Sequence, residues 1–164
     1  MFPHSLLATA RLTLDAYKAR KSMIVLAESC TGGLISALLT EVPGSSSVVE
    51  RGFVTYSNAA KSQCLGIDAD MITAYGAVSH QIAAAMASGA LEKSHADIAV
   101  AVTGVAGPAG GSLAKPVGLV HIAATDRHDV TMHRECKFGD IGRSEIRLKT
   151  TIAALTMANE MLYP

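Results

Sequence analysis

Apolar residues in the first half of the chain follow two different periods. Residues 6–17 place Leu, Ala and Tyr at intervals near 3.6, which is typical of an amphipathic helix. The runs 23–27 and 48–56 have strand length and are rich in β-branched and aromatic residues, and each leads through turn-forming residues into a helical repeat. This half therefore predicts one helix and two strand-to-helix units. Its predicted elements are helix 6–17, strand 23–27, helix 34–40, strand 48–56 and helix 58–65, the last capped by Ser57 or Asn58.

The second half continues this alternation and then ends in a hairpin pattern. The apolar strand 98–102 runs into the most glycine-dense part of the chain, 103–112. Two strand candidates flank the turn residues 126–129, and Asp140 is expected to open the final helix. Strands that alternate with helices predict a layered α/β domain. The predicted elements are helices 68–74 and 79–91, strands 98–102, 117–124 and 130–137, and helix 140–161.

Composition excludes several classes of protein. Basic and acidic residues number 14 each, so the net charge is zero, and the aromatic residues are three Phe and four Tyr without Trp. Such a chain lacks the basic and stacking surfaces that nucleic-acid binding needs. At 49% hydrophobic and 17% charged residues, the 164-residue chain is expected to fold around one core. No apolar run approaches the roughly 18 residues of a membrane span, and three cysteines without paired spacing imply no disulfide framework, so we expect a cytoplasmic protein.

Small and hydroxyl residues follow the three predicted strands that end at Ala27, Tyr56 and Val102. The carboxyl ends of strands form the ligand-binding rim of open α/β sheets, so we expect these three loops to share one pocket. Ser29 lies where the first strand turns into a helix. There it is either a nucleophile beside free backbone N–H groups or an ordinary helix cap.

Lys61 lies about one turn inside the helix that follows the second strand, on the same expected rim as Ser29. It is either a general base or a solvated helix lysine. A lysine base must be neutral, and the helix dipole is too weak to lower a pKa of about 10.4 far enough, so burial has to supply most of the shift. A carboxylate paired with Lys61 would oppose this shift, and we therefore expect Glu28 to face another partner.

Three further patterns carry reactive side chains but do not predict a site. Cys30 has no motif that pairs it with a histidine, so we interpret it as a packed thiol. The Ser-x-x-Lys pattern 112–115 follows glycines and precedes a proline, whereas a catalytic pattern of this kind opens a helix. The spacing of His128, His133 and Cys136 resembles a metal site, but alternation along a strand would send His133 and Cys136 to opposite faces. We predict neither a metal nor another cofactor.

Several motifs occur in order along nearly the whole chain. They are the segments 27–33, 43–46, 52–58 with Lys61, 103–108 and 115–118. Together they resemble the CinA C-terminal domain family. The resemblance implies one three-layer α/β/α domain over residues 1–164 with a mixed sheet. It also implies, for active members, a nicotinamide-nucleotide amidase that converts nicotinamide mononucleotide to nicotinate mononucleotide and ammonia.

Carried onto this sequence, the resemblance makes Ser29 the nucleophile and Lys61 its general base. Tyr56 is expected to hold Lys61 in position or to relay a proton, and N–H groups of a glycine loop to hold the oxyanion. Ala109 in the glycine loop and Ile141-Gly142 ahead of Arg143 depart from the family pattern. The residues expected to contact the substrate or its 5′-phosphate are Thr31, Gly32, Gly33, Ser45, Ser46, Thr103, Gly104 and Gly107.

Two other functions are compatible with the same residues. A noncatalytic module of this fold would bind a nucleotide or serve in assembly without changing its ligand. A Ser/Lys hydrolase for another small amide is a further alternative, because neither spacing nor composition identifies the nicotinamide ring. The Ala-rich helix 79–91 either packs on a second copy of the chain in a homo-oligomer or covers the sheet.

Overall fold

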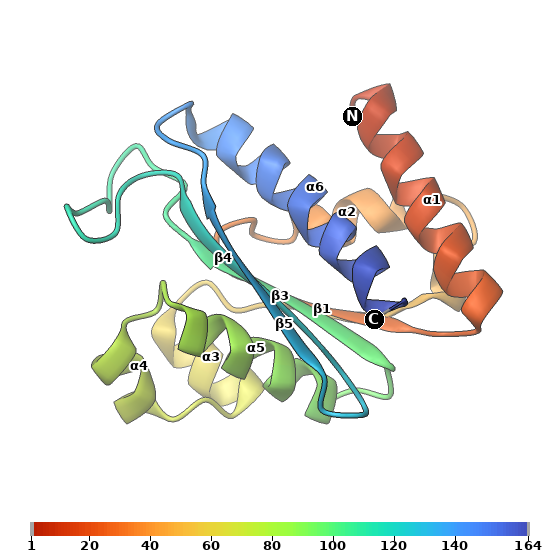
Figure 1. The fold of residues 1–164 in the computed structure, drawn as a ribbon, viewed down its shortest axis with the longest axis horizontal. Coiled ribbons are helices and arrows are strands. Elements are labelled where there is room, and N and C mark those ends of the chain that lie inside the picture. Colours follow the sequence, from red (N-terminus) through yellow and green to blue (C-terminus); the bar gives the residue numbers. More distant parts are fainter. Residues whose placement is uncertain (1, 164) are drawn as a thin grey trace.

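A five-stranded sheet forms the middle layer of the protein, as the computed structural model of residues 2–163 shows (Figure 1). The strand order is β2-β1-β3-β4-β5. The first three strands in this order are parallel, and β4 and β5 are antiparallel, so the expected mixed sheet is confirmed. The strands are β1 (Ile24–Glu28), β2 (Val49–Val54), β3 (Ile98–Gly104), β4 (Leu119–Asp126) and β5 (Thr131–Lys137).

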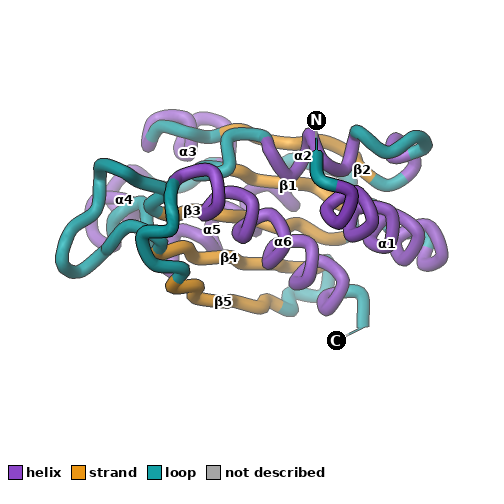
Figure 2. The backbone as a smooth tube through the Cα atoms, turned by 90° about the horizontal axis from the view of Figure 1, so that it is seen from above, coloured by secondary structure: helices purple, strands orange, loops and turns teal. Residues whose placement is uncertain are grey.

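Helices cover both faces of the sheet and complete the three-layer sandwich (Figures 1 and 2). One face is covered by α1 (His4–Arg20), α2 (Leu34–Thr40) and α6 (Arg143–Met161). The opposite face is covered by α3 (Asn58–Leu65), α4 (Ala69–Tyr75) and α5 (His80–Glu92). A short 3₁₀ turn, Ser45–Ser47, precedes β2. None of the helices within residues 2–163 is long and apolar enough to cross a membrane.

The two faces of the sheet carry side chains of different size, because strand residues alternate between faces. In β3, Ile98 and Val100 pack toward α1 and α6, whereas Ala99 and Ala101 pack toward α5. The small side chains allow the Ala-rich helix α5 to lie close to the sheet. This helix therefore covers the sheet, which is one of the two arrangements expected from its composition.

The sequence predicted the elements well, except at the start of the last helix. Ser57 and Ser79 cap α3 and α5 as expected, through bonds from Ala60 N and Ile82 N to their hydroxyls. The prediction that Asp140 opens α6 is wrong, because the helix begins at Arg143 and its cap position is Gly142 with φ at 92°. The chain makes a glycine-dependent turn there, which a cap based on aspartate side-chain chemistry does not describe.

Candidate active site

The carboxyl ends of β1, β2 and β3 meet around one cavity of about 220 Å³. These three strands are parallel neighbours, so the loops that follow them lie at the same edge of the sheet. The prediction that the three loops share a pocket is confirmed. The lining residues are Ser29 and Cys30 after β1, Tyr56, Asn58 and Lys61 after β2, Ala77 and Val78 before α5, Thr103, Gly104 and Ala106 around the end of β3, and Arg143 of α6.

Ser29 and Lys61 touch at the base of this cavity. Lys61 Nζ lies 3.0 Å from Ser29 Oγ and also donates to the carbonyl oxygen of Thr55 at 3.0 Å. Ser29 is 8% exposed and Lys61 only 1%, so Lys61 is not the solvated helix lysine of the alternative interpretation. A contact of this length permits proton transfer between the hydroxyl and the amine.

The surroundings of Lys61 favour its neutral form. Burial lowers the pKa of Lys61 below its ordinary value, and the neighbouring Cys30 opposes this shift. Its two hydrogen-bond partners are a hydroxyl and a carbonyl, and no carboxylate of residues 2–163 forms an ion pair with it. The neutral amine, which is the form that can accept a proton, is therefore favoured more than in a solvated lysine.

Glu28 faces away from Lys61, as expected. Its carboxylate is fully buried and accepts hydrogen bonds from Thr31 and from the first turn of α2. This arrangement explains how a carboxylate can lie next to Ser29 in the chain without pairing with the lysine. It also means that the N–H groups at the start of α2, which we expected to face a substrate anion or oxyanion, are occupied by Glu28.

Tyr56 lies at the mouth of the cavity and does not contact the amine of Lys61. Its side chain is 60% exposed, and its hydroxyl accepts a hydrogen bond from Arg143 Nη2 at 2.8 Å. Thr55, the residue before it, instead offers its carbonyl oxygen to Lys61 Nζ at 3.0 Å. The carbonyl of Thr55 therefore positions Lys61, a backbone role that residue type alone does not reveal.

Some of the expected binding residues reach the cavity and others do not. Thr103 and Gly104 line it, and the Thr103 hydroxyl donates to the carbonyl of Ala77 at 2.8 Å. Gly107 lies just beyond the lining residue Ala106, and its carbonyl accepts from Arg143 Nη1 at 2.9 Å. Three other residues lie in the turn behind Ser29 with their polar groups engaged inside the protein, and these are Thr31, Gly32 and Gly33.

Ser45 and Ser46 lie at the amino ends of the parallel strands, away from the cavity at the carboxyl ends. They precede the amino end of β2, which pairs in parallel with the amino end of β1 at Ile24. Ser29 follows the opposite end of β1, and a strand of this length spans about 16 Å. The structure does not bring these two serines to the cavity, because they come before a strand whose carboxyl end forms it.

Arg143 is the charged lining residue that the sequence analysis did not include among the site residues. It begins α6 and links two parts of the cavity wall, the Gly107 carbonyl and the Tyr56 hydroxyl. Lys61 and Arg143 are the two cationic residues among those that line the cavity. The one signal in the sequence was the family pattern around residues 139–143, from which Ile141-Gly142 depart, and it did not show that α6 brings Arg143 to the ends of the strands.

The other reactive residues take structural positions. Burial raises the pKa of the Cys30 thiol to about 12, which agrees with a packed thiol. His133 stacks on His80 of α5, whereas Cys136 packs against the core on the α1 and α6 side, so the two lie on opposite faces of the sheet as expected. No cluster of three or more metal-ligand side chains occurs within residues 2–163.

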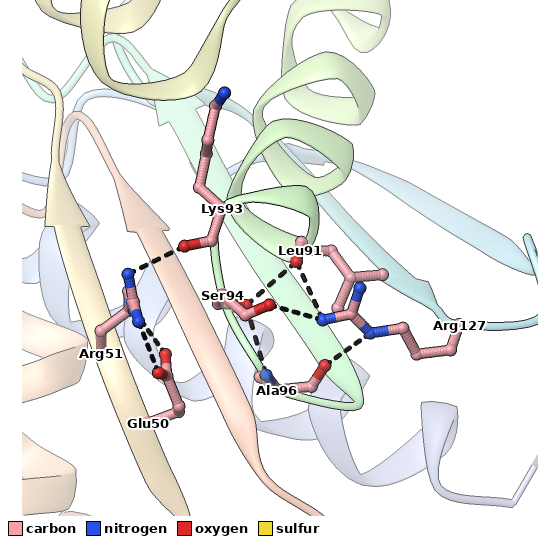
Figure 3. Close-up of polar contacts among 7 residues, drawn as sticks. All are labelled: Glu50, Arg51, Leu91, Lys93, Ser94, Ala96 and Arg127. Atoms are coloured by element: carbon pink, nitrogen blue, oxygen red, sulfur yellow. Dashed lines mark hydrogen bonds and ion pairs between the residues drawn. The ribbon is translucent and has the colours of Figure 1, made fainter.

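A second hollow, of about 330 Å³, lies next to Arg127, near the amino end of β3 and so at the opposite end of the parallel strands from Ser29. The guanidinium of Arg127 is already engaged, because it donates to the carbonyls of Leu91, Ser94 and Ala96 at 2.8–3.0 Å (Figure 3). These bonds cap the carboxyl end of α5 and the turn after it. This hollow has a structural arginine and no nucleophile paired with a base, so the cavity at Ser29 is the better candidate.

Comparisons with known proteins agree with this architecture. The nicotinamide-nucleotide amidohydrolase PncC of Escherichia coli (strain K12) is 48% identical over 142 residues, which are 86% of this chain and 85% of that protein. A CinA-like protein of Geotalea daltonii is 48% identical over 139 residues, or 85% of this chain and 33% of that longer protein. The competence/damage inducible protein CihA from Agrobacterium tumefaciens has a solved structure that superimposes with a TM-score of 0.96 at 51% identity, covering 100% of this chain and 99% of that chain. The CinA C-terminal domain pattern matches residues 7–162. The chain therefore belongs to the CinA C-terminal domain family.

Proposed function

We propose that this protein is a nicotinamide-nucleotide amidohydrolase that converts nicotinamide mononucleotide and water to nicotinate mononucleotide and ammonia. The observation that carries the proposal is the buried 3.0 Å contact between Lys61 Nζ and Ser29 Oγ. The similarity to PncC of Escherichia coli supports the choice of substrate, because that relative is named for this activity and matches over 86% of the chain.

In the proposed reaction, Ser29 Oγ attacks the carboxamide carbon while Lys61 takes the hydroxyl proton. Lys61 then returns this proton to the nitrogen, the C–N bond breaks, and ammonia leaves. Water deprotonated by Lys61 then attacks the resulting ester, the bond to Ser29 Oγ breaks, and Lys61 returns its proton to Ser29 Oγ. The acid product loses its proton to solvent and leaves as nicotinate mononucleotide. One nucleophile and one base thus serve both halves of the reaction.

Backbone N–H groups beside Ser29 are suited to hold the oxyanion. Cys30 and Ala106 both line the cavity, and their N–H groups donate no hydrogen bond within residues 2–163. The N–H group after a nucleophile is a common oxyanion donor, and one such donor accounts for about 100- to 1,000-fold in rate. This assigns the oxyanion to Cys30 and Ala106, since Glu28 occupies the start of α2.

Arg143 is the residue that we assign to the 5′-phosphate. It is the cation at the mouth of the cavity, and its planar guanidinium suits a phosphate group. Its present partners, Tyr56 and Gly107, are neutral, so binding a phosphate separates no ion pair. Thr103 and Gly104 complete the wall on the β3 side.

The proposal is tested by ammonia release from nicotinamide mononucleotide with purified variants. Ser29→Ala should abolish release, and Lys61→Ala should reduce kcat by at least about 100-fold. Cys64→Ser is the matched control, because Cys64 is exposed on the same helix as Lys61. Retained turnover in Ser29→Ala would contradict the mechanism. Nucleotide that binds to the wild-type protein and stays unchanged would favour the noncatalytic module.

Substrate choice is tested with Arg143→Ala. Loss of a charged hydrogen bond to the phosphate should raise KM for the mononucleotide by about 10- to 100-fold. Turnover of nicotinamide riboside, which lacks the phosphate, should stay the same. If Arg143→Ala raised KM equally for the mononucleotide and the riboside, Arg143 would shape the cavity without binding the phosphate. If the wild type turned over an unrelated small amide faster than nicotinamide mononucleotide, the result would favour the alternative of a Ser/Lys hydrolase for another amide.

A further inference from the structure

A fully buried carboxylate lies directly before the proposed nucleophile. Glu28 is the last residue of β1 and has no exposed surface. Its two oxygens accept five hydrogen bonds at 2.7–3.1 Å. The donors are the hydroxyl of Thr31, the N–H groups of Gly33, Ile35 and Ser36, and the hydroxyl of Ser36.

The charge of Glu28 is balanced by neutral donors and not by a cation. No lysine, arginine or histidine of residues 2–163 forms an ion pair with it. Three of the five donors are backbone N–H groups, from the N-cap residue Gly33 and from Ile35 and Ser36 in the first turn of α2, where the helix dipole also favours a negative charge. The carboxylate is thus fixed in one orientation, which turns it from Lys61 toward α2.

These bonds span the turn that carries Ser29. Glu28 anchors the turn on its strand side and binds residues up to Ser36 on its helix side. Between these anchors, Ser29 N–H donates to Val102 O and Ser29 O accepts from Gly32 N–H, both at 3.0 Å. On the outer side, Arg147 of α6 donates to the Thr31 carbonyl at 2.7 Å. The backbone of Ser29 is consequently held on several sides.

We propose that Glu28 is a positioning residue whose carboxylate fixes the turn so that Ser29 Oγ points at Lys61 Nζ at reaction distance. The inference rests on the proposed role of Ser29 as the nucleophile. Five donors converge on the two oxygens of Glu28, and an ionised carboxylate is the side-chain group that accepts at both of its ends without donating.

The test compares wild type with Glu28→Gln, which keeps the shape and removes two acceptor positions. Each oxygen of Glu28 accepts from at least one backbone N–H group, so the NH₂ group of the glutamine would face an N–H donor in either orientation of the amide. We expect kcat for nicotinamide mononucleotide to fall about 10- to 100-fold, because a shift of about 1 Å at the nucleophile has such an effect. KM should change less than about twofold, because the hydrogen bonds of Arg143 go to Gly107 and Tyr56 and not to this turn. Unchanged kcat for the folded variant would overturn the proposal.

The pH profile separates positioning from an electrostatic effect on Lys61. Positioning lowers the plateau of kcat/KM and leaves the midpoint of its rise with pH unchanged. A shifted midpoint with an unchanged plateau would overturn the proposal and make Glu28 a charge partner of Lys61. Thr31→Val removes one of the five donors and keeps the carboxylate, so it should fold and lose roughly fivefold in kcat. Cys64→Ser again serves as the control.

A fluorophosphonate probe makes the test independent of the amide substrate. Ser29 Oγ attacks phosphorus, fluoride leaves, and Lys61 takes the hydroxyl proton, so mass spectrometry of the labelled peptide reports the rate. Slow labelling of Glu28→Gln supports positioning even if the wild type releases no ammonia, in which case only the proposed substrate is wrong. Labelling at the wild-type rate overturns the role of Glu28. A wild type that neither labels nor hydrolyses overturns both proposals.

Discussion

Gly89 of α5 lies against the end of α3, and adding one methyl group there should disturb the proposed catalytic pair, Ser29 and Lys61. A Cβ atom at residue 89 would overlap the carbonyl oxygen of Leu65 and lie 3.0 Å from its carbonyl carbon. Leu65 is the last residue of α3, one turn beyond Lys61. Substituting Gly89→Ala must therefore push α3 away from α5, which carries Lys61 away from Ser29.

Two opposing effects decide whether Gly89→Ala stabilises or destabilises the protein: the higher helix propensity of alanine and the cost of overpacking. Alanine is the better helix former by about 1 kcal/mol. Overpacking costs about 1–3 kcal/mol, and here the atom that must move, by roughly 1 Å, belongs to the backbone and not to a flexible side chain. We expect a net loss of about 2 kcal/mol, which corresponds to a fall in Tm of about 4–8 °C for a domain of this size.

Urea unfolding and ammonia release test this prediction together. The displacement of Lys61 should lower kcat roughly tenfold or more, even at temperatures where the variant is folded. Ser88→Ala is the matched control, because Ser88 is the exposed neighbour of Gly89 and gains helix propensity without a clash. If Gly89→Ala is as stable and as active as Ser88→Ala, the packing of α5 on α3 does not set the position of the lysine.

Three further predictions follow from buried or capping groups. Lys61→Met should abolish activity and raise stability at pH 7. Because burial lowers the pKa of Lys61, the unfolded wild type binds more protons than the folded wild type, so its free energy of unfolding should gain on that of the variant as pH rises from 7 toward 10. The raised pKa of the Cys30 thiol lowers the stability of both proteins at the alkaline end, so the difference between their urea unfolding curves at each pH is the measurement. Burial likewise lowers the pKa of His121 and His133, so wild-type Tm should fall as pH drops below about 6.5, and His121→Phe should reduce this slope. Arg127→Ala should lower the free energy of unfolding by about 1–3 kcal/mol, because three carbonyl groups lose their donor (Figure 3). It should leave kcat unchanged, because Arg127 does not line the cavity at Ser29.

Side chains that directly follow strands were the predictable part of the site. Ser29 and Thr103 lie at or near the ends of apolar runs, and Lys61 comes one turn after a cap, so local pattern and the rule for strand ends place all three on one rim. The same rule, applied with strand direction, argues against Ser45 and Ser46, since both precede their strand.

The remaining contacts depend on tertiary structure or on backbone atoms. The Thr55 carbonyl that positions Lys61 has no signal in residue type. Arg143 reaches the cavity because α6 crosses the sheet, and the Gly142 turn that begins this helix was not predicted. The bonds from Glu28 to α2 follow from the requirement that a buried carboxylate find donors, but the sequence did not show which donors surround it.

The outermost position of β2 has a consequence for how the protein would lose its activity. Ser29 follows β1, while Thr55 and Lys61 follow β2, and β2 pairs with β1 alone among the strands of residues 2–163. The parallel register between these two strands therefore sets the distance between the proposed nucleophile and its proposed base. Separation of β2 from β1 would move Lys61 away from Ser29 while the inner strands stayed paired. Activity would therefore depend on the pairing of the outermost strand β2 with β1, and could be lost while the centre of the sheet stays folded.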